Sequence, residues 1–187
     1  MAVVVTAKGS GFIDKTGKEV IACQYEWASP FSDGLATIEK DGLQGFIDKT
    51  GKEVIECKYE WVSPFSCGMA AMELDGKQGF IDNTGREVVP CKYDAASIFS
   101  ENFAVVKRGS KFGYVDKSGR EVVGCKYDGA FPMSEGFAVV QKNDKYGFID
   151  KTGKEVVPCI YNGAKAVSEG MAPVYGNGKW SVISPGK

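Results

Sequence analysis

A ten-residue segment, Gly-Phe-Ile-Asp-Lys-Thr-Gly-Lys-Glu-Val, occupies residues 11–20 and returns four more times with small changes. The five copies begin at Gly11, Gly45, Gly79, Gly113 and Gly147, a period of 34 residues with no insertion. A fixed period of this size marks an array of small structural units. One such unit buries too little apolar surface to fold alone, so its neighbours must complete it. We therefore expect residues 1–187 to form a single repeat domain, with residues 1–10 and 181–187 as partial terminal units.

Two strands joined by a tight turn are predicted around the start of each copy. In residues 53–59 apolar and polar residues alternate, which places Ile55, Cys57 and Tyr59 on one face of a strand. The preceding Asp-Lys-Thr-Gly sequence at 48–51 fits a type I turn. Its aspartate accepts from backbone amides, and its glycine takes the positive φ that closes a bulged hairpin.

A further strand completes the unit. Residues 68–73 have strand character, and the Asp-Gly sequence at 75–76 then leads through a hairpin into the next opening glycine. Between these strands, residues 60–66 are predicted to form a loop, because Pro64 does not suit a central strand. Each unit thus contains three short antiparallel strands, and no window has the apolar spacing of a helix.

The number of predicted strands indicates whether the array is open or closed into a ring. Residues 1–10 align with residues 69–78, and residues 171–184 repeat the first two strands of a unit. The tally gives six copies of two strands and five of the third. This favours an all-β, open, solenoid-like tandem array over the alternative, a closed β-propeller with five or six small blades.

Composition excludes several functions. The chain has no histidine, which removes the commonest general base and metal ligand, so we expect neither an enzyme nor a metal centre or other cofactor. The formal net charge is −1 and no basic block occurs, which argues against nucleic-acid binding. No apolar run is long enough to cross a bilayer, so membrane insertion is not expected.

The repeated pattern resembles a known family. Gly-Phe-Ile-Asp-Lys-Thr-Gly-Lys-Glu-Val, then Lys-Tyr-Asp/Glu, then Phe-Ser-Glu-Gly followed by a hydrophobic residue and alanine, is similar to the WG repeat, also called the KWG repeat. The resemblance covers essentially the whole chain. It implies a β-repeat scaffold, found largely in bacteria, that serves in binding at cell surfaces or as a partner domain. It implies no catalytic residues.

Equivalent positions of the five copies form what we call a column. Two columns consist of residues that could bind a metal ion, and both have structural explanations. One cysteine recurs in every copy, but the close spacing of a metal site is absent, so we interpret the column as a small buried apolar stripe. Its members are Cys23, Cys57, Cys91, Cys125 and Cys159. The recurring aspartate before Lys-Thr-Gly is interpreted as a turn cap, and the recurring tyrosine as a core residue. Cys67 stands outside the column, where other copies carry an acidic residue, and is predicted to be an exposed, reactive thiol.

The candidate binding residues are aromatic residues that break the repeat. Trp27 and Trp61 are replaced in later copies by alanine or glycine. The residue before the opening glycine also changes, from Gln44 and Gln78 to Phe112, Tyr146 and Trp180. Columns that define the fold should repeat, so columns that vary are solvent-tolerant or adapted to a ligand. Two tryptophans in adjacent copies can form a platform on which a ligand stacks. The alternative is that Trp27 and Trp61 only pack against the loop between copies.

We therefore expect a non-catalytic binding or scaffold module that recognises a protein, a peptide or a polysaccharide. The first two complete units differ at nine of 34 positions, so they present similar surfaces twice, which suits extended ligands. A second interpretation is a structural spacer that self-associates through the array ends. A third is a glycan-active enzyme with paired carboxylates. Compartment stays open: reduced cysteines favour the cytoplasm, and the cell surface is possible within a larger protein.

Overall fold

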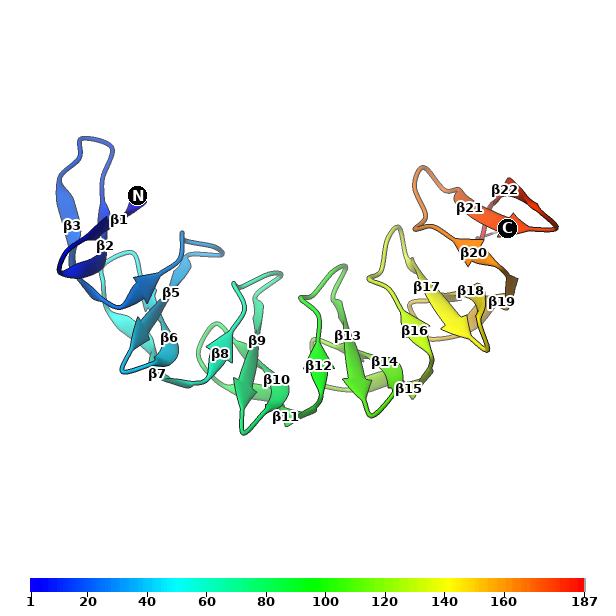
Figure 1. Cartoon of the computed structure of the whole chain (residues 1–187), viewed down its shortest axis with the longest axis horizontal. Helices are drawn as coiled ribbons and strands as arrows, with labels where there is room; N and C mark the ends of the chain where they lie inside the picture. Colours follow the sequence, from blue (N-terminus) through cyan, green and yellow to red (C-terminus); the bar gives the residue numbers. More distant parts are fainter. Residues whose placement is uncertain (187) are drawn as a thin grey trace. The chain divides into compact units, whose positions relative to one another are not determined.

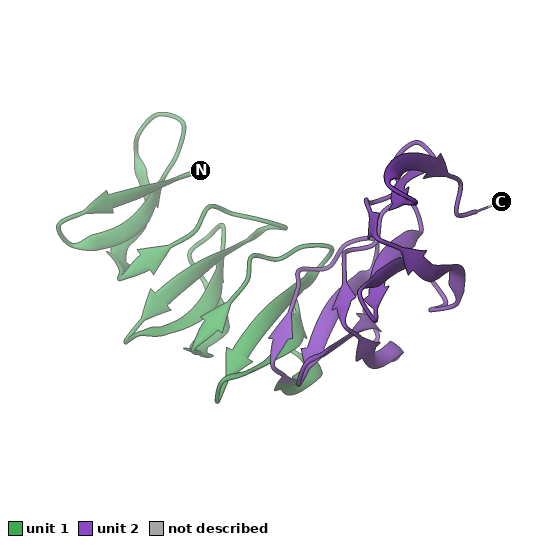
Figure 2. Cartoon of the chain, turned by 45° about the vertical axis from the view of Figure 1, so that its right-hand side comes forward, with its two compact units in different colours: residues 1–92 green, residues 93–187 purple. Residues whose placement is uncertain are grey.

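The computed structural model describes residues 1–186 of the chain, and all regular secondary structure in that part is β-strand (Figure 1). None of the described residues forms a helix that is long and apolar enough to cross a membrane. The chain divides into two compact units, residues 1–92 and residues 93–187, which are called unit 1 and unit 2 below (Figure 2). Each unit contains small antiparallel sheets that follow one another along the chain.

Unit 1 contains three sheets. The first has three strands in the order β1-β2-β3. These are β1 (Ala2–Thr6), β2 (Gly9–Ile13) and β3 (Glu19–Tyr25). The second sheet has the order β4-β5-β6-β7, with β4 (Trp27–Ala28), β5 (Leu35–Lys40), β6 (Leu43–Asp48) and β7 (Glu53–Tyr59). The third, β8-β9-β10-β11, has β8 (Trp61–Val62), β9 (Met69–Leu74), β10 (Lys77–Asp82) and β11 (Glu87–Tyr93), whose last residue is assigned to unit 2.

Unit 2 repeats this plan. Its first sheet has β12 (Ala95–Ala96), β13 (Phe103–Arg108), β14 (Lys111–Asp116) and β15 (Glu121–Tyr127) in chain order. Its second has β16 (Gly129–Ala130), β17 (Phe137–Lys142), β18 (Lys145–Asp150) and β19 (Glu155–Tyr161). The last sheet again has three strands: β20 (Gly163–Ala164), β21 (Ala172–Gly176) and β22 (Lys179–Ile183).

The all-β tandem array predicted from the sequence is confirmed, with one addition. The three expected strands of each copy are present, but the segment predicted as loop also forms a two-residue strand, such as Trp61–Val62 in β8. This strand pairs with the next one through Trp61↔Glu73 and Val62↔Met72. Two residues are too few for an alternating pattern, so the sequence gives no strand signal here.

The two ends of the chain supply strands to different sheets. Within residues 1–186, β1 pairs in the sheet β1-β2-β3 and β22 in the sheet β20-β21-β22. In a closed propeller the terminal strands usually share a blade. The strand pairing therefore agrees with the open, solenoid-like array and not with the propeller alternative.

The recurring aspartate caps its turn as predicted. One carboxylate oxygen of Asp48 accepts hydrogen bonds from the Thr50 amide (2.8 Å), the Thr50 hydroxyl (2.6 Å) and the Lys52 amide (3.1 Å). Gly51 donates its amide to the Asp48 carbonyl and has a φ of +87°. The hydroxyl of Thr50 contributes most to a lowered pKa of Asp48, because these donors stabilise the ionised form. The same arrangement occurs in the other four copies.

The opening glycine is required by a close backbone approach. A β-carbon added at Gly45 would lie 2.5 Å from the carbonyl oxygen of Ile55 and 2.7 Å from the amide nitrogen of Cys57. The register between β6 and β7 shifts at this point, as in a β-bulge that folds the third strand over the second. The equivalent glycines of the other copies meet the same obstruction. This geometry explains why glycine opens every copy.

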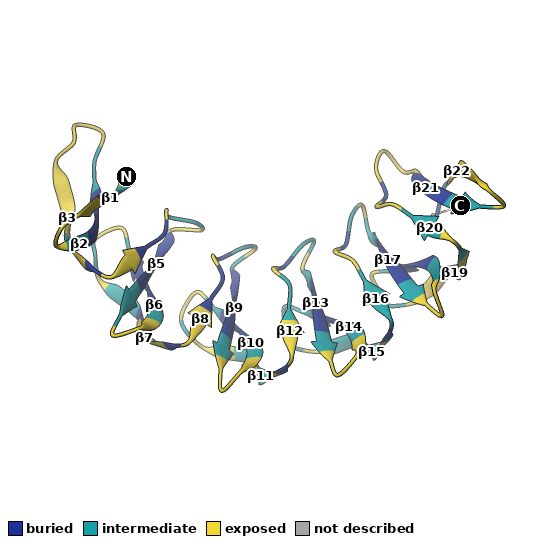
Figure 3. Ribbon diagram, in the orientation of Figure 1, coloured by how far each residue is buried: buried dark blue, intermediate teal, exposed yellow. Residues whose placement is uncertain are grey.

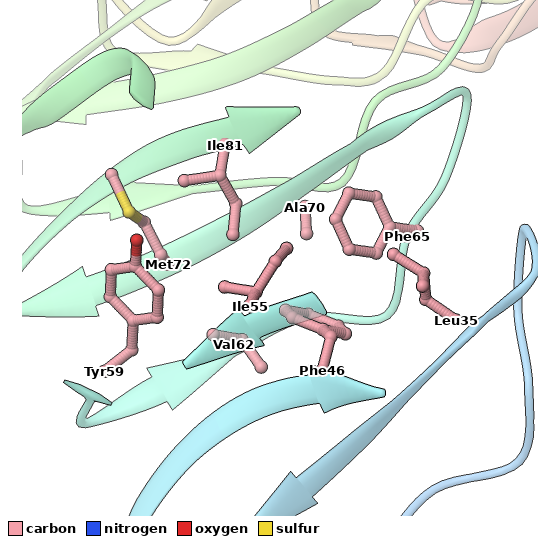
Figure 4. Packing of buried hydrophobic residues seen from close by; sticks show 9 residues of the cluster. All are labelled: Leu35, Phe46, Ile55, Tyr59, Val62, Phe65, Ala70, Met72 and Ile81. Atoms are coloured by element: carbon pink, nitrogen blue, oxygen red, sulfur yellow. The ribbon is translucent and has the colours of Figure 1, made fainter. Parts of the chain in front are cut away.

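The hydrophobic core is shared between neighbouring sheets. In Figure 4, Phe46 and Ile55 of the second sheet lie against Val62 and Ile81 of the third. Phe46 and Phe65 pack edge to face with ring centroids 4.7 Å apart. In each sheet the central strands are buried and the hairpin turns are exposed (Figure 3). Each copy therefore depends on the next for its core, as expected for a repeat protein.

Two sets of hydrogen bonds join neighbouring copies inside each unit. The Ser32 hydroxyl donates to the Phe65 carbonyl at 2.9 Å in unit 1, and Ser134 donates to the Val167 carbonyl at 2.8 Å in unit 2. The carboxylate of Glu135 accepts from the amide of Gly170 at 2.7 Å. The serine and acidic columns of the sequence thus connect one copy with the next.

Candidate ligand-binding surface

The aromatic residues that break the repeat occupy equivalent places in successive sheets. Residues directly opposite on antiparallel strands share one face of the sheet. The first residue of the two-residue strand pairs with a residue of the next strand, which pairs in turn with the residue before the opening glycine. We call these three residues the cross-strand row. The rows are Trp27–Glu39–Gln44, Trp61–Glu73–Gln78, Ala95–Lys107–Phe112, Gly129–Gln141–Tyr146 and Gly163–Tyr175–Trp180.

The two ends of the last row meet. A β-carbon added at Gly163 would lie 3.7 Å from the outer ring of Trp180, so that ring reaches across Tyr175 to the first strand of the sheet. Tyr175 and Trp180 are also in contact, with ring centroids 5.4 Å apart. A large residue at one end of this row therefore favours a small residue at the other. The opposite drift of the two columns along the chain agrees with this contact.

Trp27 and Trp61 lie together, although 34 residues separate them. Both line an open pocket of about 360 Å³ with Glu39, Gln44 and Val62. Trp27 is 47% exposed and Trp61 is 40% exposed. Large aromatic side chains with this much accessible surface are suited to contact with a ligand.

Gln44 lines this pocket and forms hydrogen bonds to residues of both copies. Its amide nitrogen donates to Glu39 at 3.0 Å, and its amide oxygen accepts from the backbone amide of Val62 at 3.0 Å. The pocket is thus built from two consecutive copies, with one side chain bonded to both. This fixes the position of the strand that carries Trp61.

The equivalent place in unit 2 is more apolar. Here Phe112 replaces glutamine and Ala95 replaces tryptophan, and the pocket of about 280 Å³ also includes Lys107, Ala130 and Pro132. The Lys107 ammonium lies 5.4 Å from the Phe112 ring centre.

The two remaining candidates lie in the last rows of unit 2. Tyr146 is half-buried and contributes to the core below it. Trp180 is 54% exposed, and Lys165 lies 5.3 Å from its ring. It lines a separate pocket with Lys165, Pro173 and Val182. The structure thus places all five candidates in rows of one type, and it joins Trp27 and Trp61 in one pocket.

The middle residue of the row is acidic in unit 1 and is not acidic in unit 2. In unit 1 the middle residue is Glu39 or Glu73, beside a tryptophan. In unit 2 it is Lys107, Gln141 or Tyr175. The units therefore present aromatic surfaces of different electrostatic character.

The cysteine column is half-buried, and each thiol for which a bond is described lies near a carbonyl of the strand two places earlier in the chain. The Sγ of Cys57, for example, lies 3.8 Å from the carbonyl oxygen of Ile38. Burial is the main cause that raises the pKa of Cys57 to about 11, since the thiolate is poorly solvated there. The column is thus a partly buried stripe of thiols. The recurring tyrosine is buried in four copies and half-buried at Tyr161.

Cys67 lies in a different setting. It is exposed and has a positive φ of 56°, as do the acidic residues at the same place in other copies, such as Asp33 and Glu101. Its exposure agrees with the predicted position on a loop, and its reactivity stays a prediction. The described part of the chain contains no group of three or more potential ligands that could hold a metal ion.

Comparison with known sequences assigns the family. The model of the WG containing repeat matches residues 11–43, 45–77, 79–112, 112–146 and 146–180. The chain belongs to the WG containing repeat family. The resemblance seen in the sequence is thereby confirmed. No curated protein matches the chain.

Solved structures show only a distant likeness to this WG repeat protein. Hsv2 of Kluyveromyces marxianus has 12% identity and a TM-score of 0.48 over 82% of this chain and 56% of its own. Hsv2 of Kluyveromyces lactis has 12% identity and a TM-score of 0.47, over 82% and 57%. The CNH domain of AfRom2 has 11% identity and a TM-score of 0.41, over 97% and 80%. The chain spans little more than half the length of the Hsv2 chains, and these matches say nothing of its function.

Sequence reasoning found the aromatic residues but missed their polar partners. Glu39 and Glu73 were not singled out, although each stands five residues before the glutamine with which it pairs. The two-residue hairpin between them fixes this register, so the Asp-Gly signal could have identified the pairs.

Proposed function

We propose that this WG repeat protein is a non-catalytic binding module that recognises an extended peptide or polysaccharide, with Trp27 and Trp61 as its main contacts. The observation that carries the proposal is the open pocket shared by these two tryptophans from consecutive copies. Aromatic anchors at the centre of a contact surface commonly supply most of its binding energy.

The surroundings of the pocket support the same proposal. Gln44 and Glu39 offer hydrogen-bonding groups beside the rings, as a peptide backbone or a sugar hydroxyl requires. The row with an aromatic residue recurs along the array, which suits a ligand with repeated groups. Each carboxylate near the rings lies in its own row and accepts a hydrogen bond from its own glutamine, so we infer no catalytic step.

Peptide and glycan arrays would test the proposal. We expect the unmodified chain to bind a subset of the array and the Trp27→Ala/Trp61→Ala variant to lose that binding. Phe131→Ala is the matched control, because it removes an aromatic side chain that is also 47% exposed but lies outside the cross-strand rows. If the double variant bound the same ligands equally well, the proposal would be wrong.

A second candidate is a structural element that self-associates through its terminal sheets. The specific observation is the exposure of Val5 in β1 (74%) and Val182 in β22 (59%), which lie in the two three-stranded sheets. Exposed apolar terminal strands are sites of edge-to-edge pairing. Light scattering should then show dimers that dissociate in a Val5→Lys/Val182→Lys variant. A monomer at all concentrations would exclude this function.

A further inference from the structure

The tryptophans of unit 1 each lie beside a carboxylate. Trp27 is directly opposite Glu39, and Trp61 is directly opposite Glu73. Gln44 and Gln78 donate to one carboxylate oxygen of Glu39 and Glu73 at 3.0 Å and 2.8 Å. These bonds orient each carboxylate and leave its other oxygen for a ligand. Two consecutive copies therefore present the same pair of an exposed indole and a positioned negative charge.

The charges around the first of these pairs are mostly negative. An adjoining pocket shares Glu39 and is also lined by Gln24, Glu26, Asp41 and Lys40. Lys40 is already engaged, since its ammonium lies 2.6 Å from Glu53. Beyond the row, in β7, Lys58 lies 5.4 Å from the ring centre of Tyr59, the residue opposite Gln44. The surface near Trp27 is thus complementary to a cation.

A guanidinium group fits this combination better than other common groups. It is planar, it stacks on an indole face, and it forms paired hydrogen bonds with a carboxylate. It is also less strongly hydrated than an ammonium group, which matters at an open pocket where the ligand is only partly desolvated. A neutral sugar would gain the stacking contact but would not use the negative charge.

From this charge complementarity we infer that unit 1 selects an arginine-bearing peptide segment. The guanidinium stacks on Trp27 or Trp61 and pairs with the carboxylate of Glu39 or Glu73. This inference rests on the proposed binding function and narrows it to one ligand class. The rows of unit 2, with Lys107 or Gln141 in the middle place, lack the carboxylate and are excluded from this role.

Tryptophan fluorescence gives a direct test. The chain has three tryptophans, so a Trp180→Phe background reports on Trp27 and Trp61 alone. The probes are synthetic Gly-Ser peptides with two arginines at varied spacing. Matched peptides carry citrulline, lysine or glutamate at the same places. We expect saturable binding of the arginine peptides, and binding of the citrulline peptides that is weaker by at least about fivefold. Binding should weaken further as salt concentration rises.

Variants that remove the two carboxylates then separate arginine selection from the general binding function proposed above. Glu39→Gln/Glu73→Gln keeps side chains of the same shape that still accept from Gln44 and Gln78, and should weaken arginine binding by about two- to fivefold. Lys107→Gln is the control and should change nothing. Thermal unfolding of each variant verifies that it folds.

The outcomes distinguish the two proposals. Equal affinity for arginine and citrulline peptides, or unchanged binding by the Glu39→Gln/Glu73→Gln variant, would overturn arginine selection. If choline or a neutral oligosaccharide bound more tightly than the arginine peptides, arginine selection would also be overturned. In each case, binding that still required Trp27 and Trp61 would leave the general function standing. Binding that did not require the tryptophans would overturn both.

Discussion

The side-chain oxygen of Gln44 accepts a hydrogen bond from the backbone amide of Val62, 3.0 Å away in the next copy of the repeat. Because the Gln44 amide nitrogen also donates to Glu39, this one side chain connects the row beside Trp27 to the strand that carries Trp61. The proposed binding surface and the contact between the two copies therefore depend on the same residue.

Replacing Gln44 by leucine should destabilise the chain by about 1–2 kcal/mol, since the Val62 amide loses its partner in a partly buried place. Chemical denaturation measures this change. The exchange Gln44→Glu/Glu39→Gln is the control, because the new carboxylate can still accept from the Val62 amide and from the new side-chain amide at position 39. A leucine variant as stable as the unmodified chain would show that water replaces the bond without loss.

The two ends of a row should be energetically coupled. Gly163→Trp places a large side chain where the ring of Trp180 already lies, so it should destabilise the chain. In a Trp180→Gln background, which imitates the rows of Trp27 and Trp61, Gly163→Trp should lower the free energy of unfolding by a smaller amount. A double-mutant cycle measures the coupling, which we expect to be about 1 kcal/mol. Strict additivity would contradict our account of the two drifting columns.

Adding one methyl group to an opening glycine should be costly. Gly45→Ala forces a contact of 2.5 Å with the Ile55 carbonyl oxygen, so we expect a loss of about 1–3 kcal/mol or more. Gly124→Ala is the matched control, because a β-carbon there meets nothing within 4 Å. The thermal midpoint should fall in the first variant and stay nearly constant in the second. Similar midpoints would mean that the β-bulge relaxes freely.

The capped turns should make the fold sensitive to acid. Hydrogen bonds, with the Thr50 hydroxyl first, lower the pKa of Asp48 from its ordinary value of 3.8. A lowered pKa in the folded state means that the turn contributes stability above pH 3.8 and that this contribution is lost as the pH falls below that value. NMR titration should give a pKa for Asp48 under 3.8, and Thr50→Val should move it upward. An unchanged pKa in that variant would contradict the assignment to the hydroxyl.

The cysteines should fall into two classes in thiol labelling. Cys67 is exposed, whereas burial raises the pKa of Cys57 to about 11 and keeps it protonated near neutral pH. A brief treatment with an alkylating reagent, followed by mass spectrometry, should therefore modify Cys67 first. Cys67→Ser should remove the fast phase. Fast labelling of Cys57 in the folded chain would show that the copies separate readily.

Much of the fold could be predicted from local sequence. Ile55 and Tyr59 are buried because alternation along a strand is a local property. Asp48 and Gly51 form their turn because both interactions lie within four residues. The two-residue strand Trp61–Val62 could not be predicted in this way, since only its pairing with Glu73 and Met72 makes it a strand.

The sequence by itself determined the 34-residue repeat, the strand alternation, the turns and the aromatic residues that depart from the repeat. Only the tertiary structure decided that Trp27 lies opposite Glu39 and shares a pocket with Trp61. The physical reason is that alternation assigns a residue to a face of its strand. Its neighbours on that face depend on strand register and on the packing of one copy against the next.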